Sequence, residues 1–417
     1  MQHIIIGAGP AGVIAAETLR KSDPDAAITI IGDEPEPPYS RMAIPYFLMN
    51  NIGEEGSYLR DPDTHYSQQN IELVQQRVEK VDAGAKQVTL ADGSSRTYDK
   101  LLLATGSSAI SPPIPGLDLP QVHSCWTLED ARHIIELAQP GANVVLIGAG
   151  FIGCIILEAL MKRGIKLSVI ETGNRMVPRM LNEKAGGLLE KWCIDKGIDV
   201  RTSCSVKSVE AADNNGVQVS LSDGSKLPAA LVITATGVKP NVDMLEGTDI
   251  KLDVGILVNH SMQTSNSDIY AAGDVAQGID FSTGNFEVQA IQPTASDHGR
   301  IAALNMSGKI TEHHGTLNMN ILDTVGLVSC SFGLWMGVDD GEQAELYNPG
   351  EFQYINLQFD GECLIGASTI GKTQHIGVLR GLIESRIQLG PWKGRLLKDP
   401  TRIMEAYVGS TQVLGYA

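Results

Sequence analysis

A short apolar run, a glycine-rich turn and an apolar pattern with helical spacing open the chain. The run is His3–Ile6, the turn begins at Gly7, and the helical pattern covers Val13–Leu19. A second apolar run, Ala27–Ile31, follows and leads into Gly32-Asp33-Glu34. This order predicts a β-strand, an α-helix and a second β-strand that ends beside acidic residues.

The same order of elements returns further along the chain. An apolar run at Asn143–Ile147 precedes a second glycine-rich turn, a helical pattern at Cys154–Arg163 and another apolar run at Lys166–Ile170. This last run leads directly into one acid, Glu171. The chain therefore repeats one strand–helix–strand device.

Both turns have the spacing G-x-G-x-x-G, which in this context is the pattern of a dinucleotide-binding unit. The first glycine makes the tight turn, the second lets the backbone approach a pyrophosphate, and the third lets helix and strand pack closely. The helix N-terminus then offers unpaired N–H groups to the phosphates. The candidates are Gly7, Gly9, Pro10, Ala11 and Gly12 in the first turn, and Gly148, Gly150, Phe151, Ile152 and Gly153 in the second.

Two dinucleotide sites in one chain predict a bound flavin and a diffusible nicotinamide. Asp33 or Glu34 would accept hydrogen bonds from a ribose at the first site. At the second site, Glu171 would accept two ribose hydroxyls of NAD and repel the 2′-phosphate of NADP. Arg175 would weaken that preference if it reached the cofactor, but a surface arginine that pairs with nearby acids is the favoured interpretation. We therefore expect NAD rather than NADP.

Three further apolar runs lack the alternation of a half-exposed strand and predict buried strands of a parallel sheet. They are 101–106, 231–237 and 269–274, and the first two end in Ala-Thr-Gly. Turns of this kind lie close to the cofactor, and Asp274 would bind a ribityl hydroxyl. The candidates from these turns are Ala104, Thr105, Gly106, Gly237, Gly273 and Asp274.

The composition is that of an ordinary globular protein, with 43% hydrophobic and 19% charged residues among 417. Lys plus Arg is 32 and Asp plus Glu is 49, so the net charge of 32 − 49 = −17 argues against nucleic acid and anionic lipid as partners. Six cysteines show no metal-ligand or disulfide spacing. The uncharged stretch 144–157 is shorter than the about 20 residues of a membrane span. We expect a reduced, cytoplasmic protein.

These segments, in this order, make the whole chain resemble the class I pyridine nucleotide-disulfide oxidoreductase superfamily. The segment Glu34–Arg41 is similar to one in NADH–rubredoxin reductases, nitrite reductase large subunits and apoptosis-inducing-factor-type flavoproteins. The resemblance implies an α/β fold with two Rossmann-like domains and a C-terminal α+β interface domain. The implied boundaries are 1–109 with 242–308 for FAD, 110–241 for NAD, and 309–417 for the interface domain.

The resemblance also implies roles for residues outside the glycine-rich turns. Asp33, Glu34 and Arg41 would contact the adenosine or pyrophosphate of FAD, and Val78 would present its backbone to the adenine. A helix that begins at Gln292-Pro293-Thr294-Ala295 and ends near Asn305-Met306 would direct its N-terminal amides at the flavin pyrimidine, where negative charge develops on reduction. Gln292 and Thr294 are therefore further FAD candidates.

The sequence also departs from the superfamily pattern. Residues 39–48 contain no cysteine, so dithiol and sulfenate chemistry are not expected and flavin is the only redox centre that we predict. A Lys–Glu pair common beside the flavin is replaced by Tyr46 or its neighbour and by Ile155. We expect no catalytic side chain, because the cofactors carry the chemistry.

Three histidines outside these motifs are candidates for metal binding or proton transfer. We interpret His313 and His314 as part of a polar connector rather than as metal ligands, and no metal is expected. His298 is interpreted as a helix-surface histidine, with proton transfer as the alternative.

The last hundred residues show apolar strand patterns at 354–359 and 363–367, a helical pattern at 376–389 and a basic tail at 392–402. The sequence thus predicts an FAD-dependent enzyme that passes electrons between NADH or NAD⁺ and an iron–sulfur carrier such as ferredoxin or rubredoxin. The chain could instead be the flavin subunit of a larger complex, for example of an aldehyde oxidoreductase. A non-enzymatic alternative is an NADH-sensing flavoprotein that changes its oligomeric state.

Overall fold

A computed structural model describes residues 1–213 and 215–414 of the chain. The chain forms two compact units, each built from two segments. The first unit contains residues 1–110 and 238–316, and the second contains residues 111–237 and 317–417.

A five-stranded parallel sheet forms the centre of the first unit, in the order β19-β7-β1-β2-β3. Its central strand, β1, is almost fully buried. The register places Ile4 of β1 opposite Thr29 of β2 on one side and opposite Leu101 of β7 on the other. Apolar side chains on both faces of a strand are typical of a parallel sheet covered on both sides. The strands are β1 (Gln2–Ile6), β2 (Ala27–Gly32), β3 (Ile71–Gln75), β7 (Lys100–Leu103) and β19 (Ile269–Ala271).

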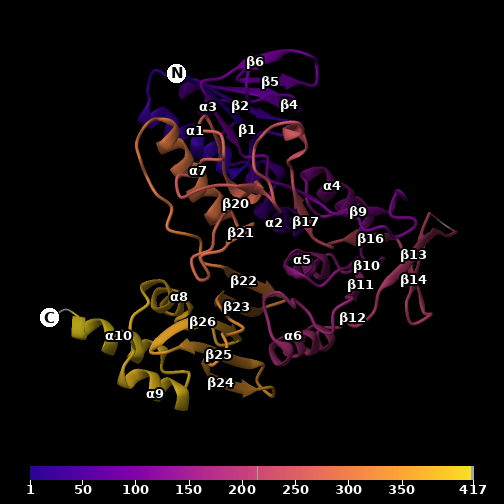
Figure 1. The fold of residues 1–417 in the computed structure, drawn as a ribbon. Helices are drawn as coiled ribbons and strands as arrows, with labels where there is room; N and C mark the ends of the chain where they lie inside the picture. The colour runs from indigo at the N-terminus through magenta and orange to yellow at the C-terminus, as the bar shows by residue number, and fades with distance from the viewer. Residues whose placement is uncertain (214, 415–417) are drawn as a thin grey trace. The chain divides into compact units, whose positions relative to one another are not determined.

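Helices α1 (Pro10–Ser22) and α7 (Gln292–Met306) lie side by side in this unit, although they are far apart in the sequence (Figure 1). They approach closely at Gly299, where a Cβ atom would lie 2.2 Å from the carbonyl oxygen of Ala11. The helix predicted to begin at Gln292 and end near Met306 is confirmed. This contact joins the C-terminal segment of the unit to its first helix.

Smaller sheets and short helices complete the first unit. The second segment of this unit begins with β17 (Val238–Pro240), which pairs with β8 (Ser107–Ala109) of the first segment. The other elements are β4 (Val78–Asp82), β5 (Gln87–Leu90), β6 (Ser95–Thr97), β18 (Ile256–Leu257), β20 (Ala276–Ile279), β21 (Phe286–Val288), α2 (Ile44–Leu48), α3 (His65–Gln68) and the 3₁₀ turns η1 (Arg41–Ala43), η2 (Glu54–Ser57), η3 (Asp243–Leu245) and η4 (Gly273–Val275).

The second unit begins with another five-stranded parallel sheet, in the order β12-β11-β10-β16-β9. A capping box at Thr127 and Asp130 starts its first helix, because each side chain accepts the backbone N–H of the other residue. The elements are β9 (Val122–Ser124), α4 (Leu128–Leu137), β10 (Asn143–Ile147), α5 (Phe151–Lys162), β11 (Lys166–Ile170), α6 (Glu183–Asp195), β12 (Asp199–Arg201) and β16 (Leu231–Thr234). An antiparallel sheet of β13 (Val206–Ala211), β14 (Val217–Leu221) and β15 (Lys226–Ala229) packs beside it.

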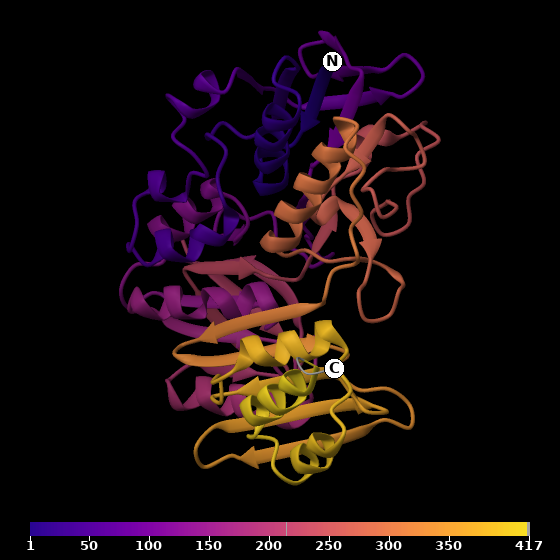
Figure 2. The same ribbon diagram turned by 90° about the vertical axis from the view of Figure 1, so that its left-hand side faces the viewer.

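An antiparallel five-stranded sheet follows within the same unit, in the order β22-β23-β26-β25-β24. Helix α8 packs on this sheet, and Figure 2 shows the three C-terminal helices on one of its faces. The predicted helix 376–389 ends earlier than expected, because Arg386 adopts a left-handed φ of 49° that stops it. The elements are β22 (Met319–Thr324), β23 (Leu327–Gly333), β24 (Glu342–Asn348), β25 (Gln353–Asp360), β26 (Cys363–Ile370), α8 (Ile376–Ser385), α9 (Pro391–Lys398) and α10 (Ile403–Leu414).

The predicted fold class is confirmed by two parallel sheets with helices and a C-terminal antiparallel sheet with helices of its own. The division into three domains stays a prediction. Within the described residues, no helix is both long and apolar enough to cross a membrane.

We predict that Gly12→Ala prevents the first unit from folding stably. A Cβ atom at this position would lie 2.0 Å from the carbonyl oxygen of Gly7, so strand and helix would have to separate at a cost of about 3 kcal/mol. Gly9→Ala is the matched steric control when all variants are compared without bound cofactor, because a Cβ there meets nothing within 4 Å. Thermal unfolding of both variants checks this, and equal melting temperatures would contradict it.

Candidate functional site

The first glycine loop joins the carboxyl end of β1 to the N-terminus of α1. Gly9 is the N-cap of this helix, and no side chain caps it. A Cβ atom built on Gly9 meets nothing within 4 Å, so a ligand has room to approach the backbone at this N-cap. This arrangement fits a dinucleotide pyrophosphate, because uncapped N–H groups and the helix dipole bind anions.

Turns after two neighbouring strands approach the same loop. A Cβ atom on Gly7 would lie 2.0 Å from the carbonyl oxygen of Ala104, which follows β7. A Cβ atom on Gly273, which follows β19, would lie 3.4 Å from the Cβ atoms of Ala11 and Ala295. The structure therefore brings together candidates from the carboxyl ends of β1, β7 and β19 and from the start of α7.

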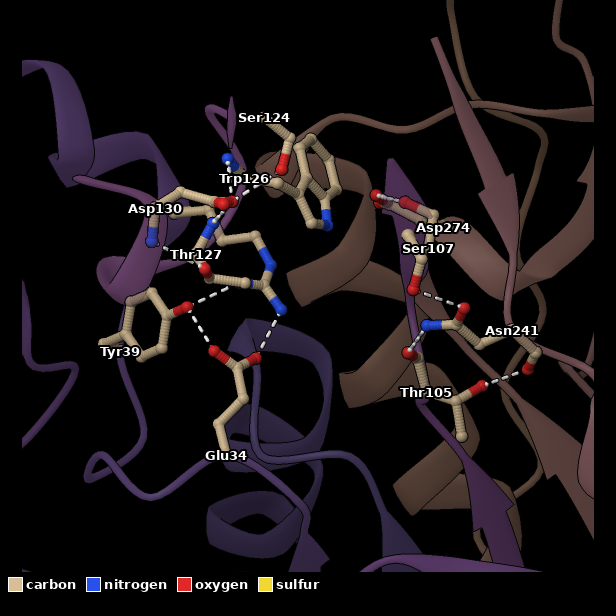
Figure 3. A network of polar contacts seen from close by, with 12 residues as sticks. Glu34, Tyr39, Thr105, Ser107, Ser124, Trp126, Thr127, Asp130, Asn241 and Asp274 are labelled. Atoms are coloured by element: carbon tan, nitrogen blue, oxygen red, sulfur yellow. Dashed lines mark hydrogen bonds and ion pairs between the residues drawn. The ribbon is translucent and has the colours of Figure 1, made fainter. Parts of the chain in front are cut away.

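Hydrogen bonds connect the turn after β7 to two other segments of the first unit (Figure 3). The hydroxyl of Ser107 donates to Oδ2 of Asp274 at 2.9 Å, and burial raises the pKa of this aspartate. Thr105 donates to the carbonyl oxygen of Asn241 at 2.8 Å, and the Asn241 amide donates back to the carbonyl of Thr105 at 2.9 Å. Sequence reasoning missed Asn241, because nothing in its local pattern indicated this pairing.

The acids after β2 differ in their surroundings. Asp33 is exposed, whereas Glu34 accepts hydrogen bonds from Tyr39 and Arg41 at 2.5 Å each (Figure 3). Burial opposes the charge of Arg41, but Tyr39 and Glu34 outweigh it and raise the pKa of this arginine. Arg41 is therefore a fixed cation in this unit, and its charge in turn acts on Asp274.

The remaining FAD candidates lie in three further elements. Gln292 begins α7 and accepts a hydrogen bond from the hydroxyl of Ser40 at 2.5 Å, while Thr294 is buried one residue beyond Pro293. The N-terminus of α7 has no side-chain cap. Val78 begins β4, and its side chain packs in the core of the first unit.

The second glycine loop joins β10 to α5 and repeats the geometry of the first. Gly150 is the N-cap of α5 without a side-chain cap, and a Cβ atom on it meets nothing within 4 Å. A Cβ atom on Gly148 would lie 2.5 Å from the carbonyl oxygen of Ala235, which follows β16. Phe151, Ile152 and Gly153 form the first turn of α5, and Gly237 ends the first segment of the second unit. This loop also fits a pyrophosphate.

Glu171 lies beside this second loop and is 8% exposed. One carboxylate oxygen accepts the backbone N–H of Ala149 at 2.7 Å, and the other accepts that of Gly173 at 2.7 Å. The carboxylate therefore holds the glycine loop in place at the end of β11, which is the expected position for a ribose-binding acid.

The sequence predicted that Arg175 pairs with nearby acids, but it forms no ion pair with an acidic side chain in the part of the chain that the structure describes. Its guanidinium donates to the carbonyl oxygens of Leu181 and Pro178 and to the Asn174 side chain, so it braces its own loop.

Residues 1–296 match the family model described as pyridine nucleotide-disulphide oxidoreductase. The chain belongs to this family. It is 30% identical over 414 residues to "NADH-dependent phenylglyoxylate dehydrogenase subunit epsilon" of Aromatoleum evansii, covering 98% of each chain. It is also 29% identical to "Rhodocoxin reductase" of Rhodococcus erythropolis, covering 94% of this chain and 91% of the relative.

A solved structure of this family has the same fold over the whole chain. It is the "covalent putidaredoxin reductase-putidaredoxin complex", with a TM-score of 0.90, 26% identity, and coverage of 98% of this chain and 99% of that one. The resemblance drawn from the motifs is confirmed. The chain is an oxidoreductase that uses FAD and NAD(H).

His298 is not the surface residue that the sequence predicted. Its side chain is 3% exposed, and its ring lies edge-on to that of His313 with centroids 4.7 Å apart. The Thr316 hydroxyl lies 3.5 Å from Nε2 of both rings. Helix α7 turns this position towards the segment that follows it, which local periodicity could not reveal.

Metal binding has no support in the described part of the chain, where no group of three or more histidine, cysteine and acidic residues could hold an ion. His313 is itself buried at 6% exposure and lies within the first unit, whereas His314 is exposed. At the connector expected here, the side chain of His313 is therefore packed in the first unit while that of His314 faces solvent.

We predict that the first unit becomes less stable as the pH falls below 6.5, because of His298. Burial, reinforced by His313, lowers its pKa from 6.5 to about 3. The folded protein therefore resists protonation, and stability present above pH 6.5 is lost as the pH falls towards 3, by about 2 kcal/mol at pH 5. Urea unfolding of His298→Leu should show a shallower pH dependence than the wild type. His314→Leu, at an exposed position, should keep the wild-type slope, and equal slopes for both variants would contradict the prediction.

Proposed function

We propose that this enzyme passes electrons between NADH or NAD⁺ and an iron–sulfur carrier protein through FAD. The observation that carries the proposal is the pair of glycine loops, each of which leads into a helix without a side-chain cap and leaves open space beside its N-cap glycine, Gly9 or Gly150. The flavin, when bound, exchanges a hydride with nicotinamide and single electrons with the carrier. The chain's own residues bind and orient the two cofactors.

We place FAD at the first loop, within residues 1–109 and 242–308. Pyrophosphate would take the N–H groups of the first turn of α1, with Arg41 as the fixed cation near Asp274. The uncapped N-terminus of α7 would face the flavin. Val78, in β4, would contact the adenine.

We place NAD(H) at the second loop, within residues 110–241. Glu171 is fixed at the end of β11 by two backbone N–H groups, so its negative charge would meet the adenosine ribose and repel a 2′-phosphate. Arg175 is occupied by its own loop and does not offer a cation to such a phosphate. Both observations favour NAD over NADP.

The carrier class follows from relatives that match along nearly the whole chain. One is named rhodocoxin reductase, and one structure holds putidaredoxin reductase joined to putidaredoxin. We infer that the acceptor is a small iron–sulfur protein of the ferredoxin or rubredoxin type, and that residues 309–417 form the interface domain.

A second candidate is a flavin subunit of a larger oxidoreductase. It is favoured by the 30% identity, over 98% of the chain, to a relative named as the epsilon subunit of an NADH-dependent dehydrogenase. The two candidates share the chemistry and differ in whether the carrier is a free protein or a subunit. All six cysteines are free thiols, which supports a reducing compartment such as the cytoplasm for either.

We predict that NADH bleaches the visible flavin absorbance of the purified holoenzyme under anaerobic conditions. Oxidised ferredoxin or rubredoxin should then restore it rapidly in a stopped-flow experiment. Rapid bleaching with slow reoxidation by both carriers would favour either a flavin subunit of a larger oxidoreductase or an NADH-sensing flavoprotein. A pull-down of partner subunits would distinguish these two alternatives. Bleaching by neither NADH nor NADPH would contradict the proposal.

We predict that the charge of Glu171 decides between the two nicotinamide cofactors. Glu171→Gln keeps an oxygen acceptor but removes the repulsion of a 2′-phosphate, so the preference for NADH over NADPH should fall about tenfold, which corresponds to about 1.4 kcal/mol. Arg175→Gln is the control and should leave the preference unchanged. The ratio of kcat/KM for the two cofactors is the measurement, and an unchanged ratio in Glu171→Gln would place the cofactor elsewhere.

A further inference from the structure

The C-terminal sheet of the second unit holds the start of helix α6 through one buried hydroxyl. The side chain of Asn182 caps α6 by accepting the backbone N–H of Ala185 at 3.0 Å, and it donates to Oη of Tyr354 at 2.6 Å. Tyr354, fully buried in β25, donates to Oε1 of Glu345 at 2.9 Å. The other oxygen of Glu345 pairs with Lys184, which lies on α6 itself.

The far end of α6 is held by the same sheet. The indole N–H of Trp192 donates to the carbonyl oxygen of Val325, in the turn between β22 and β23, at 3.1 Å. The Trp192 ring also meets Phe352 edge-on, with centroids 5.0 Å apart. Helix α6 is therefore attached to the C-terminal sheet near both of its ends.

Helix α6 in turn packs against the loop of residues 172–181. A Cβ atom on Gly186 would lie 3.0 Å from Cβ of Arg175 and 3.0 Å from the carbonyl oxygen of Met176. Arg175 also donates to the carbonyl oxygen of Leu181, directly before the Asn182 cap. The loop and the start of the helix are therefore packed tightly together.

The same loop fixes the second glycine loop. The backbone N–H of Val177 donates to the carbonyl oxygen of Ala149 at 2.8 Å, while Glu171 accepts the N–H of Ala149. Val177 has a φ of +43°, which is strained for a β-branched residue and persists only where its surroundings enforce it. Those surroundings include α6, so the glycine loop depends on contacts that reach back to the C-terminal sheet.

We propose that Tyr354 is a positioning residue for NAD(H): it acts through Asn182, α6 and Val177 to keep the Gly148–Gly153 loop in its binding geometry. The inference rests on the proposed placement of NAD at this loop. A loop held in its competent conformation binds with its full affinity, and a loop that populates that conformation only in part loses affinity by the same fraction. The chemical step after binding is unaffected.

Tyr354→Phe in the holoenzyme tests this with the flavin half-reaction alone, so no carrier is needed. We expect the NADH concentration for half-maximal bleaching rate to rise about three- to tenfold, while the limiting rate stays within about twofold. Tyr347→Phe is the matched control, because Tyr347 lies opposite Tyr354 on β24 and is 46% exposed. It should behave as wild type.

Asn182→Ser supplies the second variant. Serine retains the capping function, but its short side chain cannot also reach Tyr354. It should raise the half-saturating concentration as Tyr354→Phe does, and the double variant should show no more than the larger single effect. Additive effects would show that the two residues act separately and would overturn the proposed route.

A lower melting temperature with an unchanged half-saturating concentration would show that Tyr354 is only structural, and would overturn the inference. Glu171→Ala, measured in parallel, separates this result from failure of the proposed NAD site. If Glu171→Ala weakens NADH binding and Tyr354→Phe does not, the site stands and the inference falls. If neither variant changes the half-saturating NADH concentration, the proposed placement of NAD at this loop is contradicted, and the inference that rests on it is contradicted as well.

Discussion

Two backbone contacts, at Gly12 and Gly153, set the geometry of the two glycine loops at which we propose that the cofactors bind. At each position a Cβ atom would lie about 2 Å from the carbonyl oxygen of the glycine that begins the loop, 2.0 Å at Gly12 and 2.2 Å at Gly153. Helix and strand can approach so closely only without a side chain between them. This approach fixes the start of α1 and of α5, neither of which has a side-chain cap, beside the open space at Gly9 and Gly150. The anion binding that we propose at both loops depends on that placement.

The two sites diverge in how their acids are held. Glu34 is bound by the side chains of Tyr39 and Arg41, so its charge is balanced by a neighbouring cation. Glu171 is bound by backbone N–H groups, and within the described residues it forms no ion pair with a cationic side chain. The negative charge of a carboxylate held by neutral donors is not cancelled by a neighbouring cation, so this charge can repel the 2′-phosphate of NADP at the proposed site.

The C-terminal sheet has a structural role within its own unit, in addition to the interface role that we propose for it. The bonds from Asn182 to Tyr354 and from Trp192 to Val325 join it to a helix of the preceding parallel-sheet segment, and both lie inside one compact unit. The sheet thus supports the 172–181 loop, whose strained Val177 needs a rigid support. These hydrogen bonds are part of what joins residues 111–237 and 317–417 into one unit, although residues 238–316 separate the two segments in the sequence.

Local pattern was enough to predict the parallel strands, the two glycine loops and the acid at the end of β11, whereas the helix that begins at Gln292 was implied by the resemblance to the superfamily. Glycine spacing and apolar runs are short-range signals, because they reflect steric and burial requirements of neighbouring residues. Tertiary structure alone decided that His298 is buried against His313, that Asn241 pairs with Thr105, and that Arg175 braces its own loop. The two pairings join residues distant in sequence, and all three depend on which face of a segment meets another. No periodicity encodes that choice, because it is made by packing across the whole unit.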